Sequence, residues 1–345
     1  MGRHIHIVLN NRFMNKIFLQ QRKFKYYLKS SIFLFIPRYF YRKRINSELK
    51  KITKYDFQYL NSRVNYYNKI DDNFHLRKDA VSTKELFFMQ IKKFKAKVIE
   101  KQRIKKRTTY FFDLYNYLIY FPSFFKVNYK FGDITENFSN PCIVKSRPIS
   151  ENQNSVLMKL NAIRHFYFLD DKRHFMEKKN KAVWRGNSSN SKARLNFIKS
   201  YHDVSIFNIG QHNPKVNEPW FKGYLSIQDQ LNYKFIFCIE GADTATNIKW
   251  VMSSNSICVM PKPKFETWFM EGKLIKDFHY IEVEDDFSDA EDKINFYIKN
   301  LKKSLKIIEN AKKHVEQFKN PRLEKLVSLL VLNKFFIKSN QLMDA

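Results

Sequence analysis

Glycine and proline are scarce in this chain, with only seven and nine among 345 residues. Such rarity suggests that each glycine marks a position where the backbone adopts positive φ or where another group approaches closely. Gly132, Gly186 and Gly241 each stand beside a charged residue at the end of a predicted strand. Special turns or close approach of a ligand would explain this placement.

Cysteine is rarer still, at three residues: Cys142, Cys238 and Cys258. Their number is odd and none of them has the C-x-x-C spacing, so a zinc site is not expected. Reduced thiols in a cytosolic protein are the simplest interpretation.

Long apolar runs are also missing. The N-terminal sequence MGRHIHIVLNNRF lacks the apolar core of a secretory signal. The longest apolar stretches, at 32–37 and 111–125, are too short or too polar to span a bilayer. We therefore expect a cytoplasmic protein, with contact at a membrane surface left open.

Acidic residues are few, and the positive charge is unevenly distributed. The chain has 63 lysines and arginines against 33 acidic residues, a formal charge of +30. Residues 1–110 alone hold 28 basic and 7 acidic residues. This excess indicates an anionic partner, such as nucleic acid, an anionic membrane or a phosphorylated substrate. A genome whose codons favour Lys, Asn, Phe and Ile is the alternative explanation.

The segment 22–44, RKFKYYLKSSIFLFIPRYFYRKR, interleaves basic residues with aromatic and aliphatic ones. This mixture suits a membrane interface, and residues 1–60 are the candidate membrane-surface segment. Binding of single-stranded nucleic acid and simple packing with snorkelling lysines are the alternatives. Pro37 would break any helix there.

The rest of the chain alternates apolar strands with helical segments. Apolar content of 44% is ample for real cores, and the length suggests two domains. Predicted strands lie at 143–144, 182–184, 204–209, 233–240, 256–260 and 280–283, and predicted helices at 82–107, 288–318 and 321–338. From about residue 180 to 300 this alternation indicates an α/β fold with a parallel sheet.

One stretch, KAVWRGNSSNSKARL at 181–195, has the pattern of a phosphate-binding turn. A short strand ends in Arg185 and Gly186, a polar loop follows, and Arg194 stands near a predicted helix start. Backbone N–H groups and the helix N-terminus would attract phosphate, and two arginines would add donors. An ordinary βα loop is the alternative, because neither a complete P-loop nor G-x-G-x-x-G is present.

The ordered motifs resemble glycosyltransferase family 90, the CAP10-like proteins, and most closely its bacterial lipopolysaccharide-core branch. The resemblance rests on GDITENFSNPCIVKSRPI, KAVWRGNSS, YKFIFCIEGADTATNIKWVMSSNSICVMPKPKFETWFMEGKL and HYIEVEDDFSDAEDKI, within roughly residues 128–335. The basic N-terminal third matches less distinctly.

This resemblance implies a GT-B-like fold, with two Rossmann-like domains that face a central cleft and additional N- and C-terminal helices. The expected divisions are an acceptor-side domain at 1–175, a nucleotide-sugar-binding domain at 176–318, and a C-terminal helix at 319–345 that packs back on the first domain. It also implies inverting transfer of a hexose from a UDP-sugar, with no cofactor and no obligatory metal. The absence of D-x-D from the sequence agrees with the last point.

The family's general base, an aspartate in an R-D-Y-P-like turn of the animal members, matches Asp133 in FGDIT. Gly132 replaces the preceding arginine, so the local match is imperfect. Such a base removes the proton of the acceptor hydroxyl as it attacks the anomeric carbon. The alternative is that Asp133 is only a turn or capping residue.

The remaining roles are assigned through the same resemblance. Arg and Lys side chains are expected to stabilise the leaving UDP, and two further basic residues with one glutamate are expected at the acceptor or cleft. Candidate donor-binding residues are Arg185, Gly186, Asn187, Arg194, Glu240, Gly241, Thr246, Asn247 and Lys249; the cleft residues are Lys145, Arg147 and Glu266. Many family members have arginine where this chain has Asn247, which shifts the charge to Lys249 or elsewhere.

The implied partners are a UDP-sugar, an anionic lipopolysaccharide or lipooligosaccharide core acceptor, and the cytoplasmic face of the inner membrane. Two alternatives remain: a basic nucleic-acid-binding protein, and a non-catalytic scaffold of the same fold. The first would need an RNP-like, zinc or helix-turn-helix signature, and the sequence has none.

Overall fold

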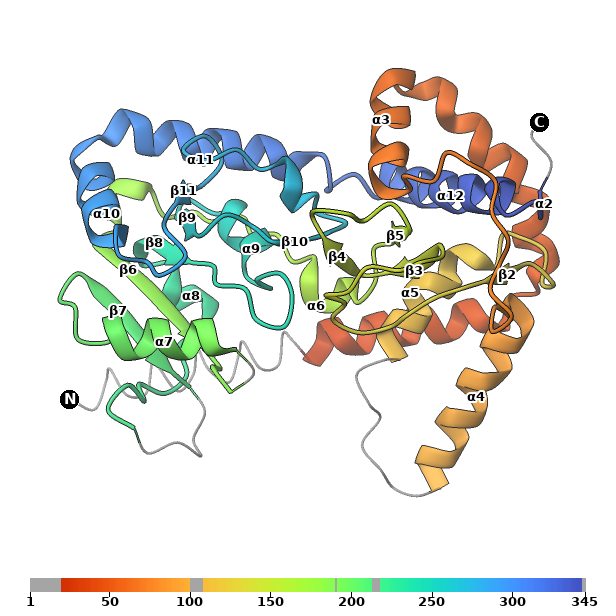
Figure 1. Ribbon diagram of the computed structural model, residues 1–345, viewed down its shortest axis with the longest axis horizontal. Coiled ribbons are helices and arrows are strands. Elements are labelled where there is room, and N and C mark those ends of the chain that lie inside the picture. The colour runs from red at the N-terminus through yellow and green to blue at the C-terminus, as the bar shows by residue number, and fades with distance from the viewer. Residues whose placement is uncertain (1–19, 100–107, 190, 213–217, 343–345) are drawn as a thin grey trace.

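The structure is a computed structural model that describes residues 20–99, 108–189, 191–212 and 218–342. Figure 1 shows an elongated molecule, with a helical N-terminal half beside a C-terminal half built on a sheet. Within the described residues, none of the helices combines the length and the apolar character that crossing a membrane requires.

The C-terminal half contains a five-stranded parallel sheet in the order β11-β9-β8-β6-β7. Its strands are β6 (Lys179–Gly186), β7 (Phe207–Gln211), β8 (Tyr233–Phe237), β9 (Ile257–Met260) and β11 (Ile281–Glu282). The predicted α/β class and parallel sheet are therefore confirmed. The chain moves from β6 outward to β7 and then returns to the other side of β6, so the strand order reverses between β6 and β8.

Alternate residues of each strand pack into different cores, as the pleat of a strand requires. On one face, Trp184 and Phe237 meet α7 (Lys192–Tyr201), α10 (Ala290–Lys299) and the start of α11 (Leu301–Glu316). On the other face, Val183 and Ile236 join a larger core with the short helix α9 (Ile248–Met252). The segment predicted as one helix at 288–318 is thus two helices, α10 and α11, separated at Asn300.

The N-terminal half is mostly helical. It contains a helix at 20–35, then α2 (Arg38–Leu49), α3 (Phe57–Tyr67), α4 (Thr83–Ile99), α5 (Thr108–Leu118) and α6 (Ala162–His165). Pro37 separates the first two helices as predicted. Ser82 and Glu85 form reciprocal hydrogen bonds at the start of α4, which confirms the predicted helix start.

Among the residues that the structure describes, the strands of this half form two-stranded sheets. Parallel β3 (Cys142–Val144) and β5 (Ser155–Leu157) make one, and antiparallel β1 (Val81–Ser82) and β2 (Lys126–Val127) make another. A third pairs β4 (Ser146–Pro148) with β10 (Phe265–Thr267), which comes from the C-terminal half. A second Rossmann-like sheet is not found among the residues that the structure describes, so the two-domain GT-B arrangement is not confirmed.

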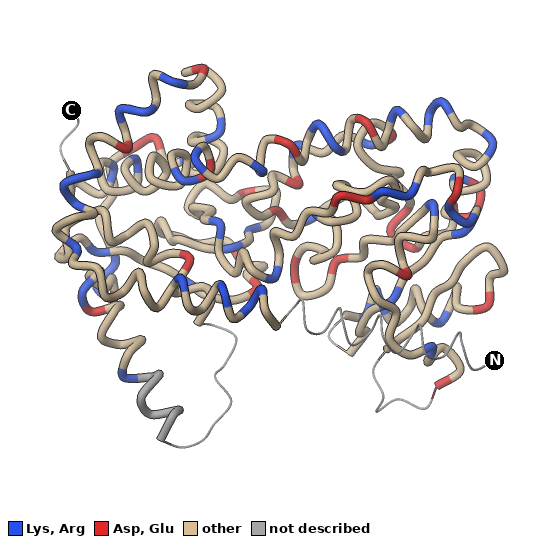
Figure 2. Tube along the Cα trace, turned by 180° about the vertical axis from the view of Figure 1, so that it is seen from behind, with Lys and Arg blue, Asp and Glu red and all other residues tan. Residues whose placement is uncertain are grey.

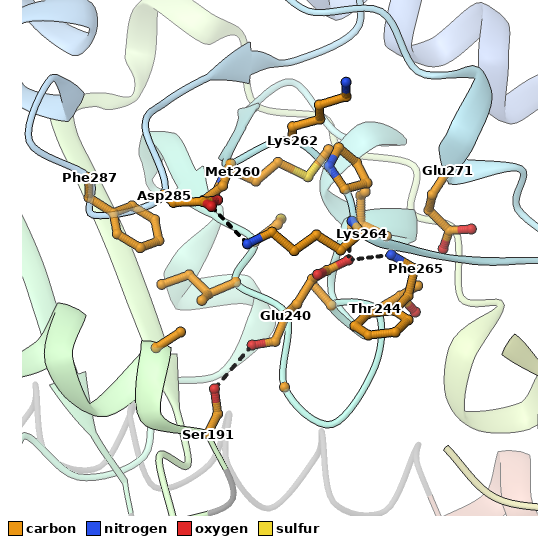
Figure 3. A pocket seen from close by; sticks show the side chains of 18 residues that line it. Ser191, Glu240, Thr244, Met260, Lys262, Lys264, Phe265, Glu271, Asp285 and Phe287 are labelled. Atoms are coloured by element: carbon orange, nitrogen blue, oxygen red, sulfur yellow. Dashed lines mark hydrogen bonds and ion pairs between the residues drawn. The ribbon is translucent and has the colours of Figure 1, made fainter. Parts of the chain in front are cut away.

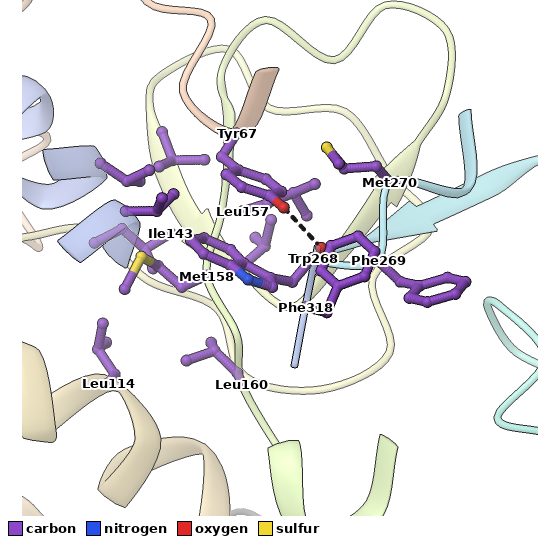
Figure 4. Packing of buried hydrophobic residues seen from close by; sticks show 14 of the residues in the cluster. Tyr67, Leu114, Ile143, Leu157, Met158, Leu160, Trp268, Phe269, Met270 and Phe318 are labelled. Atoms are coloured by element: carbon purple, nitrogen blue, oxygen red, sulfur yellow. Dashed lines mark hydrogen bonds between the residues drawn. The ribbon is translucent and has the colours of Figure 1, made fainter. Parts of the chain in front are cut away.

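The last helix, α12 (Pro321–Lys338), returns to the N-terminal half and packs on α3 and α5. Its Glu324 accepts hydrogen bonds from Arg63 at 2.8 Å and from the Trp268 indole at 2.8 Å. Trp268 stacks on Tyr67 with ring centroids 3.8 Å apart (Figure 4). Side chains far apart in the sequence therefore form one core that fixes the two halves to each other.

Candidate active site

A cavity of about 240 Å³ lies at the C-terminal ends of β8 and β9, beside the first turn of α7 (Figure 3). Its walls are Ser191, which precedes α7, Ala193 of α7, the segments 238–241 and 260–265, residues of the 244–248 segment, Glu271, Asp285 and Phe287. This position is the point where the strand order reverses between β6 and β8. Open α/β sheets bind their ligands in the crevice at that point, so the topology singles out this cavity.

The loop between β6 and α7 begins one wall of the cavity. Ser191 caps α7, because its Oγ accepts a hydrogen bond from the backbone N–H of Arg194 at 3.3 Å. The Arg194 guanidinium donates to the carbonyl oxygen of Ile239 at 2.7 Å and to that of Asn187 at 3.3 Å. Arg194 therefore ties the loop after β6 to the loop after β8.

Gly241 gives Arg194 the room for this position. A Cβ on Gly241 would lie 3.0 Å from three atoms of the Arg194 guanidinium. The rare glycine thus marks a close approach, as its scarcity predicts, although the approaching group is an arginine of the same chain rather than a ligand.

Arg185 lies elsewhere. Its Nη2 donates to Asn208 Oδ1 of β7 at 2.9 Å, and its guanidinium packs against Gly210, where a Cβ would clash with Nη1. Arg185 does not line the cavity, and neither do Gly186 and Asn187. The sequence grouped the two arginines, but the structure brings only Arg194 to the cavity's edge.

Glu240 lines the cavity and is held by backbone N–H groups. Its Oε1 accepts from Lys264 N at 3.1 Å and from Phe265 N at 3.2 Å. Burial raises the pKa of Glu240 to about 7, against the lowering effect of those two hydrogen bonds. The cavity thus holds a carboxyl group that titrates near neutral pH.

The loop after Glu240 supplies a further polar group that the candidate set left out. Thr244 lines the cavity, and its buried Oγ1 has no hydrogen-bond partner within the described part of the chain. A buried hydroxyl costs free energy unless it is hydrogen-bonded. The Thr244 hydroxyl is therefore a ready donor or acceptor for a ligand.

Two other predicted donor-binding residues, Thr246 and Asn247, lie after this loop and do not line the cavity. Asn247 Nδ2 donates to the carbonyl oxygen of Phe237 at 2.9 Å, and Thr246 is half-buried outside the cavity lining. Lys249 is completely buried, with its Nζ 2.5 Å from Glu271 Oε1. Lys249 itself does not line the cavity, and its charge is neutralised by Glu271, which does line it.

Asp133 meets the C-terminal half through a shared lysine. The buried Nζ of Lys145 lies 2.5 Å from Asp133 Oδ1 and 2.5 Å from Asp243 Oδ2, in the loop after β8. The Asp133 side chain is 36% exposed, whereas that of Asp243 is buried. Lys145 thus joins a solvent-accessible carboxylate of one half to the cavity loop of the other.

The electrostatics of this cluster keep Asp133 ionised. Partial burial would raise the pKa of Asp133, but the charges of Lys145 and Arg164 and a hydrogen bond from Lys145 outweigh it and lower this pKa. Burial raises the pKa of Asp243, although Lys145 opposes that effect. The arrangement therefore provides one accessible, negatively charged carboxylate at neutral pH.

Arg147 and Glu266, which were expected at the acceptor or cleft, form a buried pair where the two halves meet. They pair across β4 and β10, with Arg147 Nε 2.8 Å from Glu266 Oε1 and both side chains fully buried. Arg147 also donates to the carbonyl oxygen of Ser155 at 2.7 Å. Antiparallel pairing of strands from the two halves turns these residues toward each other, so they stabilise the junction instead of lining an open cleft.

Asp243 and Tyr110, whose hydroxyl lies 3.4 Å from Asp133 Oδ1, were missing from the candidate set. Asp243 lies two residues after Gly241, and its position in a loop after a strand was the available signal. Tyr110 has no comparable signal, because it lies in an aromatic helix. Among the described residues, no group of three or more His, Cys, Asp and Glu side chains could hold a metal ion.

A parallel sheet with a cavity at its switch point, and an ionised carboxylate presented beside the cavity loop, fit a group-transfer enzyme of the glycosyltransferase class. Comparison with known proteins makes this specific. The model of the family "Glycosyl transferase family 90" matches residues 161–324. The O-glucosyltransferase LpsA of Dichelobacter nodosus is 35% identical over 322 residues, which are 92% of this chain and 96% of that protein. The chain therefore belongs to glycosyl transferase family 90 and is a glycosyltransferase.

Proposed function

We propose that the protein transfers a hexose, with inversion, from a UDP-sugar to a lipopolysaccharide or lipooligosaccharide core acceptor. The relative's name, O-glucosyltransferase LpsA, favours glucose as the sugar. The observation that carries the proposal is the Asp133–Lys145–Asp243 cluster, which links an accessible carboxylate to the loop of the switch-point cavity.

The cavity is the proposed donor site. The N-terminus of α7 carries partial positive charge, and Ser191 and Ala193 of its first turn line the cavity. Arg194 at the edge, together with the Thr244 hydroxyl, would complete the contacts to the diphosphate and sugar. Glu240 would accept a hydrogen bond from a ribose or sugar hydroxyl. These cationic and dipolar groups lead us to expect no obligatory metal and no cofactor.

Asp133 is the proposed general base. The acceptor hydroxyl attacks the anomeric carbon from the face opposite UDP, its proton passes to Asp133, and the bond to UDP breaks with the electron pair on the leaving phosphate oxygen. Lys145 holds Asp133 ionised and in place before the acceptor arrives. The proposed arrangement is a GT-B variant, in which the helical half supplies the base and the sheet half the donor site.

The acceptor and the location follow from charge. A lipopolysaccharide core is anionic and lipid-anchored, and the first 110 residues hold 28 basic against 7 acidic residues. A basic surface concentrates a protein at anionic lipid. We therefore place the protein at the cytoplasmic face of the inner membrane as a peripheral enzyme.

Purified protein incubated with UDP-glucose or UDP-galactose and a core oligosaccharide acceptor tests the proposal. We expect acceptor-dependent release of UDP with one donor, and a product of inverted anomeric configuration by NMR. Retention of configuration would exclude Asp133 as a base in a single displacement. No transfer with any UDP-sugar would contradict the donor class.

A further inference from the structure

The helix at 20–35 exposes an apolar stripe on the side that faces away from the protein. Phe24, Leu28, Ile32 and Phe35 are 67%, 49%, 54% and 85% exposed. Their spacing of four, four and three residues places them along one side of an α-helix. We call these four side chains the outer ridge.

The opposite side of the same helix is firmly attached. Tyr26 Oη donates to Asp113 Oδ1 of α5 at 2.7 Å, and Ser30 is buried. Phe33 packs on Tyr41 with ring centroids 4.5 Å apart. One side of the helix is therefore covered, while the apolar outer ridge is exposed. An exposed apolar patch rimmed by polar residues marks an interaction site, so the outer ridge indicates a partner.

The charges beside the outer ridge indicate what that partner is. Lys23, Lys25 and Lys29 are exposed and flank the ridge on both sides of the helix, and the first acidic residue of the sequence is Glu48. Figure 2 shows how Lys and Arg recur along the N-terminal helices. A second copy of this chain would set lysines against lysines. An anionic bilayer instead offers an apolar interior below negative headgroups.

Neighbouring elements extend the apolar surface. Phe88 and Met89 of α4 are exposed. An almost entirely apolar cavity of about 420 Å³ lies between the helix at 20–35, α4 and α5, where Tyr27, Leu34 and Phe112 line it. The surface around the outer ridge is therefore broader than one helix side.

The helix that carries the outer ridge is also connected, through its covered side, to the candidate base by α5. Asp113 of α5 holds Tyr26, and Tyr110, one turn earlier in α5, lies 3.4 Å from Asp133. Arg22 donates to the carbonyl oxygen of Phe166 at 3.3 Å, two residues after Arg164. A membrane contact at this helix would therefore bring a lipid-anchored acceptor close to Asp133.

We propose that the outer ridge inserts into the interface of an anionic bilayer, with Lys23, Lys25 and Lys29 at the lipid headgroups. This inference deepens the proposed function by assigning the membrane contact to one helix. Only its consequence for the acceptor rests on that function.

Co-sedimentation of the full chain with phosphatidylglycerol-rich vesicles, and with phosphatidylcholine vesicles, tests the membrane contact directly. The double variant Ile32→Ser/Phe35→Ser should bind anionic vesicles at least about tenfold more weakly, because two apolar side chains no longer insert. Lys25→Gln/Lys29→Gln should lose roughly tenfold on anionic vesicles, and high salt should reproduce that loss. Phe57→Ser is the matched control, since Phe57 is 65% exposed on α3; it should bind like the wild type.

Unchanged vesicle binding in Ile32→Ser/Phe35→Ser would overturn the proposal. A second result would also overturn the proposal: the wild type forms a dimer in sedimentation velocity and binds no vesicles, and this variant loses the dimer. The partner of the outer ridge would then be a second copy of the chain. The vesicle measurement involves no sugar transfer, so it decides the membrane contact even if the proposed function fails. If the membrane contact and the proposed function both hold, Ile32→Ser/Phe35→Ser keeps its UDP affinity and loses transfer only to acceptor that is embedded in vesicles.

Discussion

The two halves of the molecule build their parts of the site in different ways. The C-terminal half places its cavity through backbone topology, because parallel strands and the reversal between β6 and β8 create a crevice wherever such a sheet forms. The N-terminal half contributes one carboxylate, Asp133, held by a buried lysine. The first arrangement tolerates many side-chain changes, whereas the second depends on single charged groups.

The contrast between Lys145 and Lys249 shows this difference within one residue type. Both ammonium groups are buried and lie 2.5 Å from a carboxylate oxygen. Lys145 contacts the accessible Asp133, whereas Lys249 contacts the fully buried Glu271. We therefore expect Lys145 to affect stability and the pKa of Asp133, and Lys249 to affect stability and, through Glu271 in the cavity lining, donor binding, but not the pKa of Asp133.

The largest effect is expected for Asp133→Asn. An amide cannot accept the acceptor's proton, so kcat should fall about 10³-fold, within the range of general-base catalysis. UDP affinity should stay within about twofold, since Asp133 lies outside the cavity lining. Steady-state kinetics and calorimetric titration of UDP measure the two quantities. Glu136→Gln, an exposed carboxylate three residues away, is the control and should be unaffected; near-wild-type turnover in Asp133→Asn would remove the assignment.

The next largest effect is expected for Lys145→Met. It leaves the buried Asp243 without its counter-charge, so the free energy of unfolding should fall by about 3–5 kcal/mol. Urea denaturation measures this loss, and a Lys145→Met/Asp243→Asn double variant should recover part of it. Since Lys145 lowers the pKa of Asp133, the acid limb of the kcat/KM profile should also move to higher pH.

Lys249→Met separates the two lysines. It should destabilise the fold by a similar amount, because Glu271 is left buried and unpaired. Its acid limb should stay where it is in the wild type. A shift of that limb equal to the shift in Lys145→Met would erase the proposed distinction between the halves.

A smaller effect concerns pH and Glu240. Because the pKa of Glu240 is raised to about 7 from 4.5, protonation favours the folded state. Stability from this group is therefore greatest below pH 4.5 and is lost as pH rises through about 7. Ionised Glu240 would also repel the diphosphate, so UDP affinity should weaken about three- to tenfold from pH 6 to 8. In Glu240→Gln this pH dependence of the UDP affinity should disappear. If the UDP affinity of the variant changes between pH 6 and 8 as it does in the wild type, Glu240 does not face UDP.

The smallest effect is expected for Gly241→Ala. The added methyl group would lie 3.0 Å from the Arg194 guanidinium, the mobile end of a long side chain. Arg194 would shift slightly, and KM for the UDP-sugar should rise about two- to fivefold with kcat unchanged. A much larger loss would mean that the exact position of Arg194 matters more than this account allows.

Local patterns in the sequence were enough to predict the sheet half. Short apolar runs ended by glycine, proline or a charged residue located β6, β8 and β9. Because parallel strands end at one edge, the sequence also indicated the edge of the sheet at which the cavity lies.

The direction of individual side chains was harder to predict. The directions of Arg147 and Glu266 could not be predicted locally, because they are set by pairing between β4 and β10, which are more than a hundred residues apart. Arg185 and Trp184 point to opposite faces of β6, and only the register with β7 decides which one meets Asn208. The contact of Lys145 with both Asp133 and Asp243 depends on packing between the halves, which no local pattern encodes.

The central claim is that the switch-point cavity is the donor site. Calorimetric titration of UDP into an Ala193→Trp variant tests it most directly, because Ala193 is exposed on α7 and lines the cavity. Ser200→Trp, also exposed and two turns further along α7, is the matched control. We predict that Ala193→Trp abolishes UDP binding while Ser200→Trp leaves it unchanged. Wild-type UDP affinity in a folded Ala193→Trp variant would contradict the account.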